Sequence, residues 1–152
     1  MGANKSRFLL AENPNPEKYL GLWYEIARKP FEYEDPNSSN TTASYSMNYD
    51  GSLCVENSTI VNGKRKTSIG KAVPKNGNWS HLRVSFFIGA WADYRIILLD
   101  KNYRYSVVSN EDDSVIWILS RTPYLKEIQN IIDDLVNNHG IVNDFIFPLQ
   151  GN

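Results

Sequence analysis

The chain has 152 residues, of which 41% are hydrophobic, and its 16 basic side chains nearly balance 17 acidic ones. This length predicts one domain, over residues 1–152, that buries roughly 70% of the surface of the unfolded chain. The balanced charge excludes the basic stripe that nucleic-acid phosphates require. Cys54 is the only cysteine, and His81 and His139 are far apart in the sequence. We therefore expect no internal disulfide, no metal site and no cofactor.

The N-terminal sequence MGANKSRFLLAENPNP contains no apolar run of signal-peptide length, and the chain has no 18-residue apolar run. We expect residues 1–13 to form a flexible lead-in to a soluble or membrane-peripheral protein. An exported protein or outer-membrane lipoprotein whose leader has been removed is the alternative. Gly2 and Ser6 fit the myristoylation pattern M-G-x-x-x-[ST], although Met-Gly also arises from cloning. The compartment is left open by these features.

Turn signals then recur at short spacing between alternating or β-branched runs. The turns are Asp50-Gly51, Asn62-Gly63, Lys75 to Gly77, Gly89 to Asp93, Lys101-Asn102 and Asn110 to Asp113, with a longer loop from Phe31 to Ser39. They predict eight strands, near residues 22–30, 40–48, 53–61, 64–73, 79–87, 94–100, 103–109 and 114–120. Such short connections make each consecutive pair of strands antiparallel.

Eight consecutive antiparallel strands either form an open sheet with two exposed edges or close on themselves. Closure removes the edges and their tendency to aggregate, so we expect an up-and-down barrel. The interior of an eight-stranded barrel is just large enough for packed side chains or one small ligand. The predicted fold is therefore all-β, with a choice between a filled and a ligand-holding interior.

After the barrel the hydrophobic period changes from two to 3.6 residues. One apolar stripe is formed by Leu125, Ile128, Ile131, Ile132, Leu135 and Val136. Thr122 fits the N-cap, Pro123 the first helical position and Gly140 the end of this helix. Because the opposite face is acidic rather than basic, we expect the helix to pack on the outside of the barrel and not on a membrane. Asn143 to Leu149 is expected to be a short edge strand.

Strand polarity places three segments at one end of the barrel. In an eight-strand meander the first strand begins where the last one ends, so Trp23 and Arg121 share that end, together with the turn from Asp100 to Tyr103. The indole can close the barrel, and the guanidinium can cover it by a cation-π contact worth about 1 to 2 kcal/mol. Arg121 has further donors for the carbonyls of the NPEKYLG segment. One end is therefore expected to be closed.

The same segments carry a family resemblance. GLWYEIAR resembles the G-x-W motif of the lipocalins, LLDKNY their second motif and WILSRTP their third. The order and spacing over residues 14–150 are most similar to those of bacterial outer-membrane lipocalins and apolipoprotein D. Leu99 replaces an expected threonine, and the disulfides and acylated N-terminal cysteine of some members are absent. The resemblance implies a lipocalin barrel whose closed end is formed by Gly21, Trp23, Asp100, Tyr103 and Arg121.

The opposite end is then expected to be the ligand entrance. Its loops carry large apolar side chains, which are unusual in solvated loops: Phe31, Tyr33, Phe87, Ile88 and Trp91. We interpret them as a rim that contacts lipid or the tail of a ligand. The alternative is that these side chains only cap a packed core.

Inside the barrel, the resemblance to the apolipoprotein D type of lipocalin implies a set of ligand-binding positions. They are Tyr45, Asn57, Phe86, Tyr94, Trp117 and Leu119. Aromatic walls with a few polar groups suit an acyl chain that ends in an oxygenated head group, although each residue could equally be core. Glu25 points inward, so we expect it to be neutral or paired with Tyr, Lys or Arg. The phase of the seventh strand is left open.

A binding function is favoured over catalysis. If Asn57 points inward, then Val55 does too and Cys54 points outward, away from any substrate. We expect a carrier of a fatty acid, lysophospholipid or similar lipid, in membrane lipid storage, transport or repair, and not an enzyme. A protein-interaction barrel with a self-filled core and a lipid-modifying enzyme are the alternatives. The expected partners are a small hydrophobic ligand and a membrane surface, for a monomer or weak homodimer.

Overall fold

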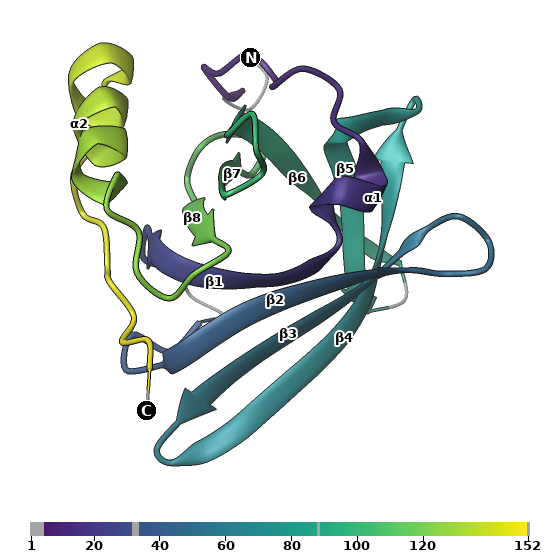
Figure 1. Cartoon of the computed structure of the whole chain (residues 1–152), viewed down its shortest axis with the longest axis horizontal. Coiled ribbons are helices and arrows are strands. Elements are labelled where there is room, and N and C mark those ends of the chain that lie inside the picture. The colour runs from purple at the N-terminus through teal and green to yellow at the C-terminus, as the bar shows by residue number, and fades with distance from the viewer. Residues whose placement is uncertain (1–4, 32–33, 88, 152) are drawn as a thin grey trace.

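The computed structural model describes residues 5–31, 34–87 and 89–151. Its strands are β1 (Gly21–Arg28), β2 (Ser39–Met47), β3 (Leu53–Val61), β4 (Lys64–Lys75), β5 (Asn78–Phe87), β6 (Ala90–Leu99), β7 (Tyr105–Ser109) and β8 (Ile116–Ser120). They form one closed antiparallel barrel in chain order, which confirms the predicted fold class. The barrel also has a short helix, α1 (Pro16–Tyr19), before β1 and a longer one, α2 (Ile128–His139), after β8 (Figure 1).

Tight hairpins join most strands because left-handed residues stand at the predicted turns. Asn62 and Gly63 have φ values of 53° and 76°, and Asn76 and Gly77 have 53° and 74°. The predicted turn from Gly89 to Asp93 is wrong, because β6 already begins at Ala90 and pairs along β5 from there. Trp91 consequently stands on a strand and not in a loop.

A β-bulge divides β1 into two parts. Its first four residues pair with β2, whereas Tyr24 to Arg28 pair with β8, with a register shift between Glu25 and Ala27. The extra residue reverses the expected alternation, so that Arg28 lies on the same face as Glu25, opposite Trp117. The barrel wall therefore contributes an inward-facing arginine that simple alternation does not predict.

The segment after α2 runs between β1 and β2, where those two strands separate. Ile146 makes a bridge with Arg28, and Leu149 makes one with Ser39. The predicted strand from Asn143 to Leu149 is thus reduced to two isolated bridges, which is consistent with Pro148 having no N–H to donate. The Gln150 amide completes the seam by donating to the backbone carbonyls of Glu25 and Thr41.

Helix α2 packs on the outside of the barrel, as predicted, but it begins later. Its first residue is Ile128, after an N-cap at Glu127, so the predicted start at Thr122 and Pro123 is wrong. The Thr122 hydroxyl instead donates to the carbonyl of Tyr124 in a local turn (2.7 Å). Gly140 ends the helix with φ 68°. The buried stripe of α2 meets β1, β7 and β8, and among the described residues no helix is long and apolar enough to cross a membrane.

The lead-in, expected to be flexible, lies along the barrel over its described part, residues 5–13. Phe8 is buried in the cluster beneath α2. Further on, the backbone N–H of Ala11 donates to the carbonyl of Ile96, and the Asn13 side chain accepts from the N–H of Trp79. These contacts place α1, which follows the lead-in, at the end of the barrel where β1 begins.

Candidate functional site

The end of the barrel at which β1 starts is closed by an indole and a guanidinium. Trp23 is fully buried, and its Nε1 donates to the carbonyl of Tyr19 (2.9 Å). The Arg121 guanidinium carbon lies 3.8 Å from the centre of the Trp23 ring. This distance is within the range of a cation-π contact, so Arg121 covers the indole.

Arg121 also ties the closed end to three segments of the chain. Its donors reach the carbonyls of Tyr103 (3.2 Å), Leu22 (3.0 Å) and Lys18 (2.8 Å). Gly21 has φ 99°, and a Cβ there would lie 3.4 Å from Arg121 Nη1. A side chain at that position would therefore require a strained backbone in contact with the guanidinium.

Asp100 organises the neighbouring turn between β6 and β7. Its carboxylate accepts from the backbone N–H of Asn102 and of Arg104, and it pairs with the Arg104 guanidinium at 3.1 Å. Those hydrogen bonds lower the pKa of Asp100 although partial burial opposes the shift. Asp100 therefore stabilises the turn that carries Tyr103 to Arg121.

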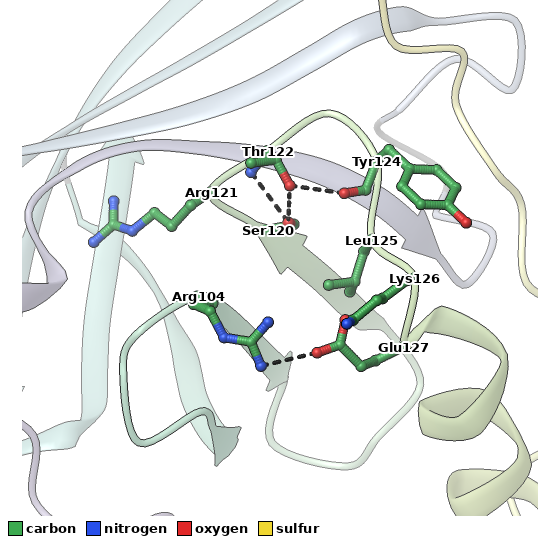
Figure 2. Close-up of a pocket in the computed structure, with 8 residues that line it drawn as sticks. All are labelled: Arg104, Ser120, Arg121, Thr122, Tyr124, Leu125, Lys126 and Glu127. Atoms are coloured by element: carbon green, nitrogen blue, oxygen red, sulfur yellow. Dashed lines mark hydrogen bonds and ion pairs between the residues drawn. The ribbon is translucent and has the colours of Figure 1, made fainter.

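A hollow of about 260 Å³ lies at this end, between β8 and α2. Figure 2 shows its lining, in which the Arg121 guanidinium points away from the other residues. Two pairs of lining residues are bonded to each other: Arg104 pairs with Glu127 at 2.8 Å, and Thr122 donates to the Tyr124 carbonyl. This hollow lies outside the barrel interior, at the end that Trp23 and Arg121 close.

The hydroxyls of Tyr19, Tyr45 and Tyr94 form a network inside the barrel next to Trp23, which we call the tyrosine floor. The Tyr94 hydroxyl lies 2.8 Å from those of Tyr19 and Tyr45, and Tyr19 also bonds to Ser106 (2.9 Å). Burial raises the pKa of Tyr19 to about 12 and those of Tyr45 and Tyr94 well above 10. The hydroxyls expected to meet a ligand thus bond to each other, and a ligand contact by Tyr45 or Tyr94 stays a prediction. Tyr19 was not predicted because no helix was expected before β1, and Ser106 was not predicted because the phase of β7 was ambiguous.

The remaining predicted ligand positions lie at different depths. Leu119 is buried in the interior cluster, and Trp117 is half-buried at its edge. Phe86 is half-buried, and its ring occupies the space of a side chain at Gly70, where a Cβ would meet it at 2.7 Å. Asn57 is on the inward phase of β3 but exposed, near the open end. An apolar wall with an exposed amide is thus present, and its contact with a ligand remains a prediction.

A second hollow, of about 490 Å³, lies on the outer surface of the wall toward this end, where β4 separates from β5 beyond Lys71, which pairs with the outward-phase Cys54. Its lining is Ile69, Gly70, Lys71, Ser85, Phe86, Gly89 and Trp91. Ile69 is 63% exposed and Trp91 43% exposed. Apolar side chains are therefore accessible beside an opening in the barrel wall.

The predicted rim is described only in part. Phe31 packs edge-on against Trp117, with ring centres 5.9 Å apart. Trp91 lies at the second hollow. Tyr33 and Ile88 lie outside the described residues, as does the side chain of Phe87.

An ionic cluster that sequence reasoning missed lies inside the wall near Trp117. Arg28 is 1% exposed, and its Nε lies 3.4 Å from a carboxylate oxygen of Glu25 and 2.9 Å from one of Glu34. Arg28 Nη2 donates to the carbonyl of Asp35 (3.0 Å). Glu25 lies next to an arginine, which is one of the expected partners. The alternation of apolar and polar residues in the sequence does not reveal the bulge that turns Arg28 inward or the loop that brings Glu34 to it.

The cluster is electrostatically unusual because one guanidinium faces two carboxyl groups. Burial is the main cause that raises the pKa of Glu25 well above its ordinary value, and the nearby Glu34 carboxylate raises it further. Arg28 opposes the shift without cancelling it. Burial and the Glu34 carboxylate therefore favour the neutral form of Glu25 more than they would in an ordinary, exposed glutamate.

The described part of the chain places Cys54 away from the barrel interior and contains no metal-binding cluster. Cys54 is half-buried between Leu53 and Val55, which are both buried in the interior cluster, so its thiol lies on the outward phase. Over the same residues, no group of three or more His, Cys, Asp or Glu side chains is arranged to hold a metal ion.

A barrel with one end closed by Trp23 and Arg121 and apolar side chains at the other is the architecture of a small-molecule binding protein. Residues 15–143 match the model of the lipocalin-like domain. The chain belongs to the lipocalin family, whose members bind small hydrophobic ligands and are generally binding or transport proteins rather than enzymes.

Several curated proteins are similar to this chain. Temperature-induced lipocalin-1 of Arabidopsis thaliana is 34% identical over 81% of this chain and 71% of its own length. The outer membrane lipoprotein Blc of Escherichia coli is 37% identical over 78% and 68%, and bovine apolipoprotein D is 31% identical over 86% and 73%. These relatives agree with the predicted resemblance.

Solved structures support the fold. Insecticyanin of the tobacco hornworm superposes with a TM-score of 0.75 at 18% identity, over 99% of this chain and 86% of its own. A lobster apocrustacyanin superposes with a TM-score of 0.73 at 21% identity, over 91% and 81%. At such low identity these likenesses establish the lipocalin barrel alone.

Proposed function

We propose that the protein binds and carries a small amphiphilic lipid, such as a fatty acid or lysophospholipid, in the open half of its barrel. The observation that carries the proposal is the contrast between the two ends. The closed end is covered by Arg121, whereas toward the other end the wall separates beyond Lys71 and leaves a hollow on its outer surface that reaches Phe86 of the interior cluster. Burying ten methylene groups at about 0.8 kcal/mol each supplies micromolar affinity after the cost of association.

The exposed side chains at the opening support transfer at a membrane surface. Ile69 and Trp91 are accessible there, and Lys64, Arg65 and Lys66 are exposed on the same hairpin arm as Ile69. Aromatic and aliphatic groups near basic side chains suit the interface of an anionic bilayer. Such contact would place the opening next to the lipid that enters or leaves, in keeping with a role in membrane lipid storage, transport or repair.

A protein-interaction barrel with a self-filled interior is the second candidate. It is favoured by the tyrosine floor, in which Tyr19, Tyr45 and Tyr94 use their hydroxyls on one another. In this alternative the open half would also be occupied by the protein's own side chains. The two candidates therefore differ in whether that half admits a ligand.

Lipid mass spectrometry of the purified protein tests the proposal. We expect acyl lipid to co-purify in stoichiometric amount, and a solvent-extracted protein to bind N-phenyl-1-naphthylamine, an uncharged dye, and to release it to oleate. Absence of both lipid and dye binding would favour the self-filled barrel. A lipid-modifying enzyme would instead convert a lipid in a manner that Cys54→Ala abolishes, and no such turnover is expected.

A further inference from the structure

The Arg28 guanidinium occupies an unusual position for a structural ion pair. Arg28 is only 1% exposed to solvent. It lies opposite Trp117 on the inward face of β1, after the bulge. Burial of a charge in such surroundings is costly unless every donor is satisfied. Among the described residues, however, Nη1 and Nε of Arg28 have no well-directed hydrogen bond, although two carboxylates lie near Nε.

The donors of Arg28 are thus only partly used. A guanidinium presents five N–H groups in a planar fork that matches an oxyanion with two oxygens. Here the Asp35 carbonyl takes one donor on Nη2, and Glu34 approaches Nε with one oxygen. The Glu34 side chain is 16% exposed, so it reaches the guanidinium from the solvent side of the cluster.

The surroundings suit the junction between the head and tail of an amphiphile. Trp117, with Phe31 packed on its edge, supplies an apolar wall next to the guanidinium. Water is excluded there, which strengthens a charge-assisted hydrogen bond. We propose that Arg28 is the head-group receptor, and that it binds the carboxylate or phosphate of a single-chain lipid in place of the Glu34 carboxylate.

This inference rests on the proposed lipid-binding function and adds the class of head group. Exchange of the Glu34 carboxylate for another anion keeps an anion on the guanidinium, so Arg28 is never left unpaired inside the barrel. Glu25, which burial favours in its neutral form, adds little repulsion to an incoming oxyanion. Glu34 then acts as an internal competitor that lowers the affinity for anionic lipids.

The test compares charged and uncharged ligands that share one acyl chain. Displacement of N-phenyl-1-naphthylamine is measured with oleate, oleyl alcohol and 1-oleoyl lysophosphatidate on the full chain and on two variants. Glu34→Gln removes the competitor, so we expect its affinity for oleate to rise about threefold or more with the alcohol unchanged. Arg28→Gln is expected to weaken oleate binding about tenfold and the alcohol less than twofold. The anion that responds more strongly to both variants identifies carboxylate or phosphate as the head group.

Glu127→Gln is the matched control, because it removes a carboxylate from Arg104, which also faces two acids but at the closed end. It should leave every affinity unchanged. If Arg28→Gln fails to fold, the affinities of Glu34→Gln for oleate and oleyl alcohol alone test the inference. The inference is overturned if both ions and the alcohol respond equally, or not at all, to Glu34→Gln while the dye still binds. If dye and lipids fail to bind the wild type, the proposed function fails as well.

Discussion

The two ends of the barrel interior are filled by different chemistry. At the closed end, three phenols bond to one another, whereas the indole of Trp23 and the guanidinium of Arg121 donate to backbone carbonyls. Toward the open end, Arg28 faces two carboxyl groups with donors left over, and the wall separates beyond Lys71. The closed end is therefore a set of mutually bonded groups that stabilise the fold, whereas the proposed binding of lipid concerns the open end.

Removal of the indole should have the largest effect. Trp23→Ala deletes a fully buried side chain together with its contact to Arg121, and we expect the free energy of unfolding to fall by about 3 to 5 kcal/mol. Urea unfolding followed by circular dichroism measures the loss. Trp91→Ala, at a 43% exposed position of the open end, is the control and should cost less than about 1 kcal/mol. Equal losses would remove the distinction between the ends.

A side chain at Gly70 should disturb the open half. A Cβ there would lie 2.7 Å from both the Phe86 ring and the Ser85 carbonyl oxygen, so Gly70→Ala is expected to cost about 1 to 3 kcal/mol by overpacking. The same variant should change the affinity for N-phenyl-1-naphthylamine, because Phe86 must move within the hollow. Thr67→Ala, at an exposed position on the outward phase of the same strand, should change neither quantity. An unaltered dye affinity in Gly70→Ala would argue against ligand contact by Phe86.

The ionic cluster predicts a pH dependence of stability. The pKa of Glu25 is raised in the folded protein above its ordinary value of 4.5, so the folded state holds this proton more tightly than the unfolded state does. The contribution of Glu25 is therefore present below pH 4.5 and is lost as the pH rises through the folded pKa, at up to about 1.4 kcal/mol per pH unit. Urea unfolding of wild type and Glu25→Gln across this range measures it. A difference between the two that does not vary with pH would contradict the assignment.

The tyrosine floor predicts a smaller effect in alkali. Because the pKa of Tyr19 is raised to about 12, folding stability from this phenol should be lost as the pH rises from 10 through 12. Tyrosinate absorbance of the wild type should therefore contain a component that appears only in this range. Tyr19→Phe should lack that component and lose about 1 kcal/mol from its two hydroxyl contacts. An identical titration of both proteins would place Tyr19 outside a buried network.

The closed end was largely predictable from the sequence, and the ionic cluster was not. Chain polarity alone brings Trp23, Arg121 and the turn at Asp100 together, because strand order determines which ends meet. The inward position of Arg28 depends on a one-residue bulge, and Glu34 reaches it from an irregular loop. The turn predicted from Gly89 to Asp93 was also wrong, because β6 begins at Ala90 and pairs with β5 through these residues. Periodicity describes regular elements, and this candidate binding group arises where regularity breaks.

Quenching by a brominated fatty acid tests most directly whether lipid enters through the open end alone. Trp117 stands on the open side of the interior, whereas Trp79 lies near the closed end, beside Asn13 of the lead-in. We predict that dibromostearate quenches the wild type, that Trp117→Phe reduces this quenching, that Trp91→Phe combined with Trp117→Phe abolishes most of it and that Trp79→Phe leaves it intact. Quenching that persists in Trp117→Phe and disappears in Trp79→Phe, or no quenching at saturating lipid, would contradict the account.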